Sequence, residues 1–398
     1  MAYDVTAVRK HFPALAEGAA HFDGPGGSQV PDVVAEAVAA TMVSGIANRG
    51  SVTAAEKRAT GIVIDARQAM ADLLGASPEG IVFGRSMTQL TYDFSRTLAK
   101  EWGAGDEIVV SRLDHDANIR PWVQAALAAG ATIRWVEPDP VSAELPVETI
   151  AAALTDRTRL VAVTGASNLV GTRPDIPTIA AAVHEVGALL YVDGVHLTAH
   201  APVDVTALGA DFYACSPYKF LGPHLGALAA APALLAGLRP DKLLPATDDV
   251  PERFEFGTLP YELLAGTTAA VDFLAGLVAG AGDRRSRLLA SMAALEAYED
   301  ELRVRLETGL DAIGGVTRYG RAARRTPTVL FSVAGMDSQR VYQELGKHGV
   351  NAPAGSFYAI ECARVLGLGE AGAVRAGVAP YTDANDVDRL LAAVHVTS

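Results

Sequence analysis

The stretch "YVDGVHLTAHAPVDVTALGADFYACSPYKFLGPHLG" (Tyr191–Gly226) predicts the fold, because it carries an aspartate and a lysine at the ends of two apolar runs. Asp193 ends an apolar run, and Asp211–Cys215 forms a second apolar run that leads through Ser-Pro-Tyr to Lys219. A lysine so close to a buried strand is unusual, because lysine is among the residues least often buried. Two strands joined by a helical stretch, each followed by a charged residue, indicate an α/β sheet whose strand ends face one pocket.

The composition is typical of a globular protein with a large core. Half of the 398 residues are hydrophobic and 20% are charged, which excludes a disordered chain. The net charge of −13 argues against nucleic acid or an anionic membrane as a partner. Cys215 and Cys362 are the only cysteines, and so few predict a reducing, cytoplasmic compartment. The first residues do not read as a signal peptide, and no apolar run is long enough to span a membrane.

Short β-branched runs alternate with Ala/Leu-rich helical stretches such as 121–129 and 177–186. This alternation predicts an α/β fold with a mostly parallel sheet. The expected strands are Glu107–Ser111, Thr132–Val136, Leu160–Thr164, Leu189–Asp193, Asp211–Cys215 and Gly226–Ala230.

Near residue 274 the pattern changes to a long helix, about 284–310, followed by shorter strands near 328–333 and 374–378. We expect residues 26–273 to form a large α/β domain and residues 274–398 a small α+β domain. Residues 1–25 should form an N-terminal segment that packs with the small domain.

Asp193 and Lys219 together match the needs of pyridoxal 5′-phosphate. The lysine forms a Schiff base with this cofactor, and the carboxylate keeps its pyridine nitrogen protonated so that the ring accepts electrons. Desolvation would lower the pKa of the lysine and make its amine nucleophilic. Taken singly, each residue has a plainer explanation, a helix N-cap for Asp193 and a solvated surface position for Lys219.

The cofactor's phosphate needs a cradle, and "GRSMTQ" (Gly84–Gln89) is the candidate. It follows a strand-like run and opens a helical one, so Ser86, Met87 and Thr88 would stand at a helix N-terminus, which binds anions. A simple Ser/Thr N-cap explains the same residues. Ser216 and Tyr218 would add two hydroxyl groups.

Eight segments in one order resemble the class V aminotransferases of pyridoxal phosphate fold type I, and among them the cysteine-desulfurase-like proteins. The segments are "FDGPGGSQVP" (Phe22–Pro31), "GRSMTQ", "LDHDANIRPW" (Leu113–Trp122), "SNLVGT" (Ser167–Thr172), "VDGVH" (Val192–His196), "SPYKFLGPHLG" (Ser216–Gly226), "FEFGT" (Phe254–Thr258) and "VRAGVAPY" (Val374–Tyr381). The resemblance covers nearly the whole chain. It implies the fold type I architecture, a large parallel-sheet domain with a smaller α+β domain.

The resemblance also implies roles for particular residues. His115 would stack on the pyridine ring and help to move protons, while Asn168 and His196 would lie near the ring oxygen. Thr258 would reach the phosphate of a neighbouring subunit, which implies a homodimer with shared active sites.

On the substrate side, the resemblance implies that Arg375 clamps the substrate carboxylate, with Asn48 and Arg49 nearby. His115 has another explanation as half of a metal pair in Asp114-His115-Asp116, but no third ligand stands at metal spacing, so we expect no metal.

The chain departs from the family where a desulfurase carries its catalytic loop cysteine. Alignment on Gly355 places Tyr358 at that position, and Cys362 lies four residues further on. We expect Tyr358 to line the substrate pocket and Cys362 to be a small buried residue. Glu361 beside it would also raise the pKa of its thiol.

These features predict a pyridoxal phosphate enzyme acting on a small α-amino acid, with C–S cleavage of cysteine or a cysteine derivative favoured by the resemblance. An epimerase or an aminotransferase of the same family is the alternative. A non-catalytic binding homologue is the alternative from another class, and the presence of both Asp193 and Lys219 argues against it.

Overall fold

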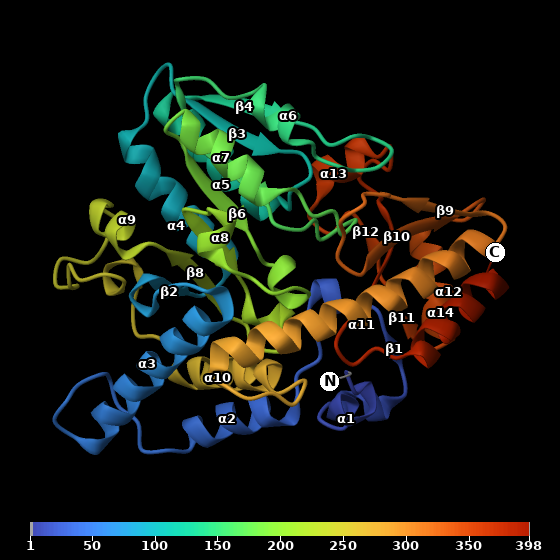
Figure 1. The fold of residues 1–398 in the computed structure, drawn as a ribbon, viewed down its shortest axis with the longest axis horizontal. Helices are drawn as coiled ribbons and strands as arrows, with labels where there is room; N and C mark the ends of the chain where they lie inside the picture. Colours follow the sequence, from blue (N-terminus) through green and yellow to red (C-terminus); the bar gives the residue numbers. More distant parts are fainter. Residues whose placement is uncertain (1–2, 398) are drawn as a thin grey trace.

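The computed structural model describes residues 3–397, which form two lobes (Figure 1). The larger lobe is built on a seven-stranded sheet of order β2-β8-β7-β6-β5-β3-β4. β8 runs antiparallel to both of its neighbours, β2 and β7, and the other neighbouring strands pair in parallel. The fold class predicted from the sequence is confirmed. The strands are β2 (Ile81–Gly84), β3 (Glu107–Ser111), β4 (Thr132–Val136), β5 (Thr158–Thr164), β6 (Leu189–Asp193), β7 (Phe212–Cys215) and β8 (Gly226–Ala230).

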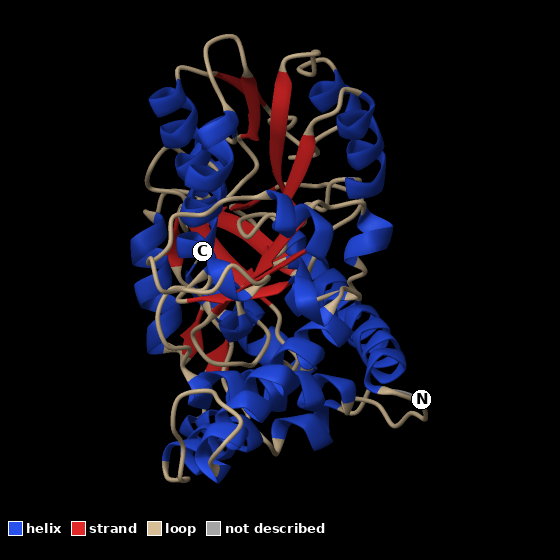
Figure 2. Cartoon of the chain, turned by 90° about the vertical axis from the view of Figure 1, so that its left-hand side faces the viewer, coloured by secondary structure: helices blue, strands red, loops and turns tan. Residues whose placement is uncertain are grey.

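Helices flank this sheet on both sides, as Figure 2 shows. Parallel strands need such crossovers, and the helices bury both faces of the sheet. This explains why β6, β7 and β8 read as nearly continuous apolar runs. The α-helices of this lobe are α2 (Asp32–Met42), α3 (Ala54–Leu74), α4 (Met87–Leu98), α5 (Arg120–Ala129), α6 (Val147–Ala151), α7 (Ile176–Glu185), α8 (Val205–Leu208), α9 (Pro232–Gly237) and α10 (Tyr261–Ala275).

The smaller lobe contains a four-stranded antiparallel sheet of order β12-β13-β10-β9. A separate parallel pair, β1 with β11, joins residues near the N-terminus to this lobe. Ala20 and Phe22 accordingly belong to the core of the small lobe. Its elements and those of the N-terminal segment are α1 (Val5–Arg9), β1 (Ala20–His21), β9 (Val316–Tyr319), β10 (Thr328–Val333), α12 (Ser338–Lys347), β11 (Val350–Asn351), β12 (Ala354–Gly355), α13 (Ile360–Val365), β13 (Ala373–Gly377) and α14 (Ala384–Thr397).

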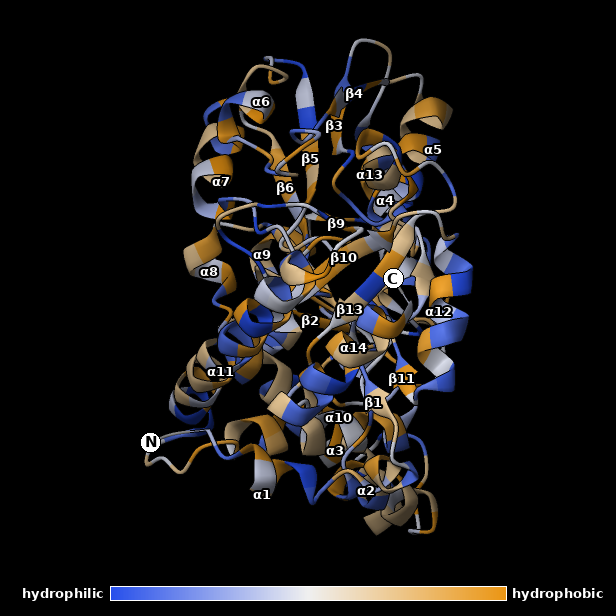
Figure 3. Cartoon of the chain, turned by 90° about the vertical axis from the view of Figure 1, so that its right-hand side faces the viewer, coloured by the Kyte–Doolittle hydropathy of each residue, from blue (hydrophilic) through white to orange (hydrophobic). Residues whose placement is uncertain are grey.

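The long helix α11 (Arg284–Ala312) links the two cores. Leu288, Met292 and Leu295 pack into the core of the large lobe, whereas Leu302 and Leu306 pack into that of the small lobe. Hydrophobic and hydrophilic stretches alternate along the helix (Figure 3). The predicted boundary at residue 274 lies at the end of α10, before this shared helix.

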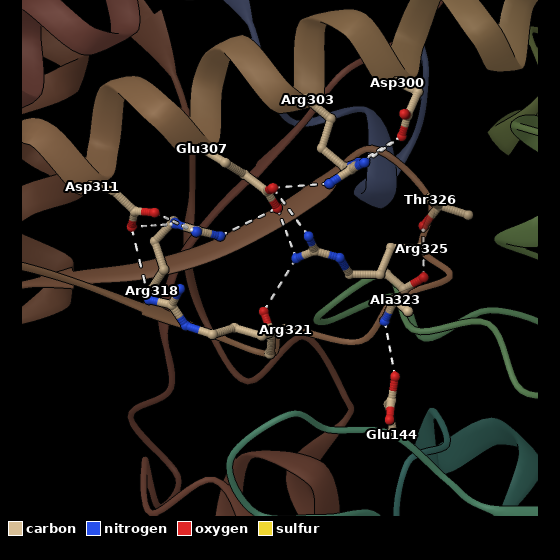
Figure 4. A network of polar contacts seen from close by, with 12 residues as sticks. Glu144, Asp300, Arg303, Glu307, Asp311, Arg318, Arg321, Ala323, Arg325 and Thr326 are labelled. Atoms are coloured by element: carbon tan, nitrogen blue, oxygen red, sulfur yellow. Dashed lines mark hydrogen bonds and ion pairs between the residues drawn. The ribbon is translucent and has the colours of Figure 1, made fainter.

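A buried ionic network fixes the small lobe against α11 (Figure 4). Glu307 on α11 pairs with Arg303 at 2.8 Å, Arg318 at 3.3 Å and Arg325 at 2.7 Å. The loop after β9 contacts the large lobe, where the backbone N–H of Ala323 donates a hydrogen bond to the Glu144 carboxylate at 2.9 Å. Such contacts hold the two lobes around the cleft described below. Within residues 3–397, no helix is both long and apolar enough to cross a membrane.

Candidate active site

The carboxyl ends of the parallel strands converge on one cavity, as expected for an open α/β sheet. Asp193 is the last residue of β6, and Lys219 follows β7 in a short 3-10 turn, Pro217–Lys219. All the predicted cofactor-binding residues except Thr258 line this cavity: Ser86, Met87, Thr88, His115, Asn168, Asp193, His196, Ser216, Tyr218 and Lys219.

Lys219 is partly buried, and its Nζ donates a hydrogen bond to the carbonyl oxygen of Pro25. The pKa of Lys219 is lowered to about 7, mainly by burial and also by the charge of Arg375, while Asp193 opposes the shift. At neutral pH a large fraction of the amine is therefore unprotonated, which is the form that attacks a carbonyl group.

Asp193 is buried, and its Oδ1 accepts a hydrogen bond from the backbone N–H of Val195 at 3.0 Å. Burial raises the pKa of Asp193 to about 6, with the Val195 hydrogen bond and Lys219 opposing the shift. The group is thus mainly ionised at neutral pH. A buried carboxylate in this state favours a cationic partner inside the cavity.

The N-terminus of α4 forms the end of the cavity suited to an anion. Ser86 is the N-cap, and its Oγ accepts from the backbone N–H of Gln89 at 3.1 Å, so the plainer explanation of Ser86 holds as well. The Thr88 side chain faces the cavity and makes no hydrogen bond to another described residue. The free N–H groups of the first turn and the helix dipole favour negative charge here.

A close approach of β8 positions this helix start. A Cβ atom on Gly226 would lie 2.2 Å from the carbonyl carbon of Ser86. Only glycine allows the strand to pass so near the N-cap, which fixes the anion site relative to Lys219.

His115 lies over the cavity in a neutral form. Its Nδ1 accepts from the backbone N–H of Ala117 at 3.0 Å, which leaves the proton on Nε2. Burial lowers the pKa of His115 to about 3, and the charges of Lys219 and Arg375 add to the effect. A neutral imidazole can stack on an aromatic ring and donate from Nε2, but it is not a cationic acid at physiological pH.

Two buried polar atoms at the cavity lack a partner among the described residues. They are Oδ1 of Asn168 and Nδ1 of His196. The other ends of both side chains are held: Asn168 Nδ2 donates to Phe357 O at 3.0 Å, and His196 Nε2 bonds Thr328 Oγ1 at 2.9 Å. An unpaired buried polar group is costly, so these atoms fit a ligand that brings its own hydrogen-bonding oxygen.

The donor set therefore fits pyridoxal 5′-phosphate. An amine at Lys219, a carboxylate at Asp193 and an anion site at α4 meet in one cavity. The unpartnered atoms of Asn168 and His196 suit the ring oxygen. The structure brings these residues together, and their individual roles stay predictions.

Arg375 lies on β13 and reaches the neighbouring part of the cavity, where it is almost fully buried. One guanidinium nitrogen donates to Asn168 O at 2.9 Å, and the Phe357 ring centroid lies 3.7 Å from Cζ. Burial lowers the pKa of Arg375 to about 9, so the group is still charged at neutral pH. A fixed buried guanidinium is suited to a carboxylate.

Tyr358 lies at the mouth of the cavity, 5.5 Å from His115 between ring centroids. Phe357 and Tyr358 have φ angles of 52° and 59°, a left-handed backbone that non-glycine residues rarely adopt. The N–H of Asp116 donates to Tyr358 O at 2.7 Å, and Asn168 holds the Phe357 carbonyl. The loop is therefore held over the cavity by contacts on both residues.

Cys362 is fully buried in α13, as predicted for a small core residue. Burial raises its pKa to about 12, and the buried carboxyl of Asp114 adds to the shift. The sequence correctly predicted that the pKa of the Cys362 thiol is raised, but it was wrong to give Glu361 as the cause. Glu361 is paired instead with Arg112 and, at 2.7 Å, with Arg120.

Three predicted residues do not reach the cavity within one chain. Asn48, Arg49 and Thr258 are exposed. The Arg49 guanidinium pairs with Glu252 at 3.1 Å, and the Arg49 N–H bonds the Tyr261 hydroxyl at 3.3 Å. Arg49 therefore lies beside the segment that carries Thr258. Their proposed contacts with a cofactor or substrate stay predictions.

Sequence reasoning missed several residues around the cleft. Tyr92, Arg120 and Gln124 line a cavity of about 760 Å³ that also contains Lys219 and Arg375. Tyr92 follows the predicted residue Thr88 by one helical turn, so an i, i+4 search from Thr88 would have found it, whereas Arg120 and Gln124 follow no predicted residue at that spacing.

Comparison with known proteins gives a consistent result. The family model for aminotransferase class-V matches residues 20–390. An aminotransferase-like protein of Gibberella zeae is 34% identical over 99% of this chain and 98% of its own. A probable cysteine desulfurase of Mycobacterium leprae is 31% identical over 98% of this chain and 96% of its own. The crystal structure of a cysteine desulfurase from Escherichia coli superposes with a TM-score of 0.86 at 27% identity, over 99% of this chain and 98% of that one.

Proposed function

Since the chain belongs to the class V aminotransferase family, we propose that it is a pyridoxal 5′-phosphate enzyme that cleaves the C–S bond of cysteine or a cysteine derivative. One observation carries the proposal. Lys219, Asp193 and the N-terminus of α4 line a single cavity, with Arg375 in the adjoining part. When bound, the cofactor supplies an electron sink for the bonds at the substrate's Cα.

The chain's own residues divide the remaining work. Arg375 holds the substrate carboxylate, and Lys219, whose pKa is about 7, takes the proton from Cα. Asp193, whose carboxylate is buried and mainly ionised, would keep the ring nitrogen of the bound cofactor protonated. His115 would face the ring as a neutral imidazole, and the loop at Tyr358 would limit the entry of water.

The product leaves without a persulfide on the protein. Cys362 is fully buried and its thiol has a raised pKa, so it is neither a thiolate nor within reach of a substrate. Tyr358, which is 75% exposed, occupies the loop position. The reaction is thus of the lyase type, in contrast to a persulfide-forming desulfurase.

A homodimer with shared sites is the proposed assembly, and the reducing cytoplasm is the proposed compartment. Arg49 lies beside the segment that carries Thr258 and Phe256, which is 46% exposed, and Val52, three residues after Arg49, is 81% exposed. Apolar side chains at this exposure fit an interface with a second copy. Both cysteines are free and buried, as expected where thiols stay reduced.

The test is to purify the protein with the cofactor, reduce it with borohydride, and locate the modified lysine by mass spectrometry. We expect label on Lys219 alone, and label elsewhere would refute the site. The unreduced protein is then mixed with L-cysteine and its S-substituted derivatives. Release of a thiol or sulfide with pyruvate supports a lyase. A D-amino acid or an oxo acid that retains sulfur would instead identify an epimerase or an aminotransferase.

A further inference from the structure

His196 connects the cofactor cavity to the small lobe. Its ring is only 2% exposed and lines the cavity that contains Asp193 and Lys219. One ring nitrogen, Nε2, lies 2.9 Å from Oγ1 of Thr328, the first residue of β10, which is also buried. The other nitrogen, Nδ1, is buried and has no partner among the described residues. The small lobe therefore holds one side of the ring, and the other side is left for the contents of the cavity.

The surroundings of His196 keep its ring neutral. Burial lowers the pKa of the imidazole well below its usual value, and the charges of His200, Lys219 and Arg375 add to the effect. The His200 ring packs edge to face on that of His196, with 4.8 Å between centroids, and its Nδ1 lies 2.8 Å from the buried Glu299 carboxyl group. A neutral imidazole carries its proton on one nitrogen only, so the site must select between Nδ1–H and Nε2–H.

The Thr328 hydroxyl makes this selection. Within residues 3–397 its oxygen has no hydrogen-bond partner other than His196 Nε2. If Nε2 carried the proton, it would donate to Thr328 Oγ1 and leave the buried hydroxyl hydrogen without an acceptor. If the hydroxyl donates to Nε2, that hydrogen is used and the imidazole proton lies on Nδ1. An unpaired buried donor is costly, so the second arrangement is favoured.

A proton on Nδ1 also complements the other unpartnered group of the cavity. Asn168 Nδ2 donates to Phe357 O, so Asn168 presents only its Oδ1, an acceptor, to the cavity. An oxygen placed between Asn168 and His196 would meet two acceptors if Nδ1 were unprotonated. With the proton on Nδ1 it meets one acceptor and one donor, which suits the ring oxygen of pyridoxal 5′-phosphate.

From this geometry we propose that Thr328 is a positioning residue of the cofactor site, whose hydroxyl donates to His196 Nε2 and thereby holds the His196 proton on Nδ1, facing the ring oxygen of the bound cofactor. The hydrogen bond of one ring nitrogen commonly fixes the proton on the other in this way. Because Thr328 belongs to the small lobe and His196 follows β6 of the large lobe, the donor depends on the packing of the two lobes. The inference rests on the proposed cofactor site and not on which substrate bond is cleaved.

The first readout is the position of the proton on His196. Full-length protein with ¹⁵N-labelled histidine rings is studied by NMR, first cofactor-free and then loaded, and His196 is assigned among the nine histidines by comparison with His196→Gln. We expect a neutral ring protonated on Nδ1 in the native protein and in Thr328→Ser, which keeps the hydroxyl. In cofactor-free Thr328→Val, which keeps the shape alone, this tautomer should no longer dominate.

The second readout is the dissociation constant of pyridoxal 5′-phosphate, measured from its visible absorbance. Thr328→Val should weaken binding by about 2–10-fold, the effect of one hydrogen bond, and Thr328→Ser should restore it. Thr267→Val is the matched control, because it removes another fully buried hydroxyl, one that donates to Leu263 O within α10. This control should change neither the cofactor affinity nor the His196 signals.

A native protein that binds the cofactor but protonates His196 on Nε2, or on both nitrogens, would overturn the role of Thr328, and this result needs no variant to fold. A Thr328→Val protein that keeps both the Nδ1 proton and the native affinity would overturn it as well. If the native protein takes up no cofactor, the proposed function itself fails, and the role of Thr328 fails with it.

Discussion

The reactivity of Cys362 separates direct C–S cleavage from the persulfide chemistry of a desulfurase. Its pKa of about 12 leaves roughly one thiol in 10⁴ ionised at pH 8, whereas about a quarter of ordinary thiols, with pKa near 8.5, are ionised. Ionisation alone therefore slows the thiol about 2,000-fold. The thiolate of a weaker acid is intrinsically more nucleophilic, and a Brønsted slope of 0.4–0.5 raises its rate constant by roughly 40-fold. The net expectation is a reaction at least about 50-fold slower, before burial is counted.

The assay is thiol–disulfide exchange with an aromatic disulfide at pH 8, followed by mass spectrometry of the Cys362 peptide. Tyr358→Cys is the matched control, since position 358 is 75% exposed and lies in the loop just before α13. We expect the thiol at position 358 to react at the rate of an ordinary thiol, and Cys362 to react only after unfolding. A second sample is incubated with L-cysteine and alkylated.

Two results would refute this reasoning. One is that Cys362 in the folded protein reacts within a few-fold of the control thiol. The other is a mass gain of one sulfur on the Cys362 peptide that disappears, together with activity, in Cys362→Ser. Either would mean that α13 opens and that the buried thiol of this structure is a resting state.

Further outcomes follow from the same site. Reconstitution of the cofactor-free enzyme should accelerate up to about pH 7 and then level off, because the pKa of Lys219 is lowered to about 7; a rate that keeps rising toward pH 10 would indicate an unperturbed lysine. Asp193→Ala should still bind the cofactor by absorbance yet turn over about 10²–10³-fold more slowly, and near-normal turnover would remove its role. Glu361→Gln should lower the free energy of unfolding by about 1–3 kcal/mol in urea titrations, since Arg112 and Arg120 lose their buried partner but keep Glu137 and Asp116; an unchanged midpoint would contradict this. Hybrids of Lys219→Ala and Thr258→Ala subunits should carry one intact site per dimer, whereas a monomer by light scattering would rule out shared sites.

The local sequence pattern was sufficient to predict the fold of the large lobe and the positions of Asp193 and Lys219. The bounds of β3 and β6 match the sequence prediction because buried parallel strands are continuous apolar runs between helices, and those of β4 and β8 match as well. Asp193 and Lys219 could be placed at strand ends for the same reason, and parallel strands put their carboxyl ends on one edge. The family resemblance is confirmed by the class V match over residues 20–390.

Long-range packing decided what the sequence could not. Glu361 looked like a neighbour that would tune Cys362, but its carboxylate is bonded to Arg112 and Arg120, more than 240 positions earlier in the chain. The size of the cleft likewise depends on how α4, α5 and the loop at Phe357 enclose it. Such contacts join residues with no local signal, because a side chain's partners and burial are set only when separate elements pack. The sequence by itself therefore determined the fold and the residues at the strand ends, and the tertiary structure determined their charge states and the room left for a substrate.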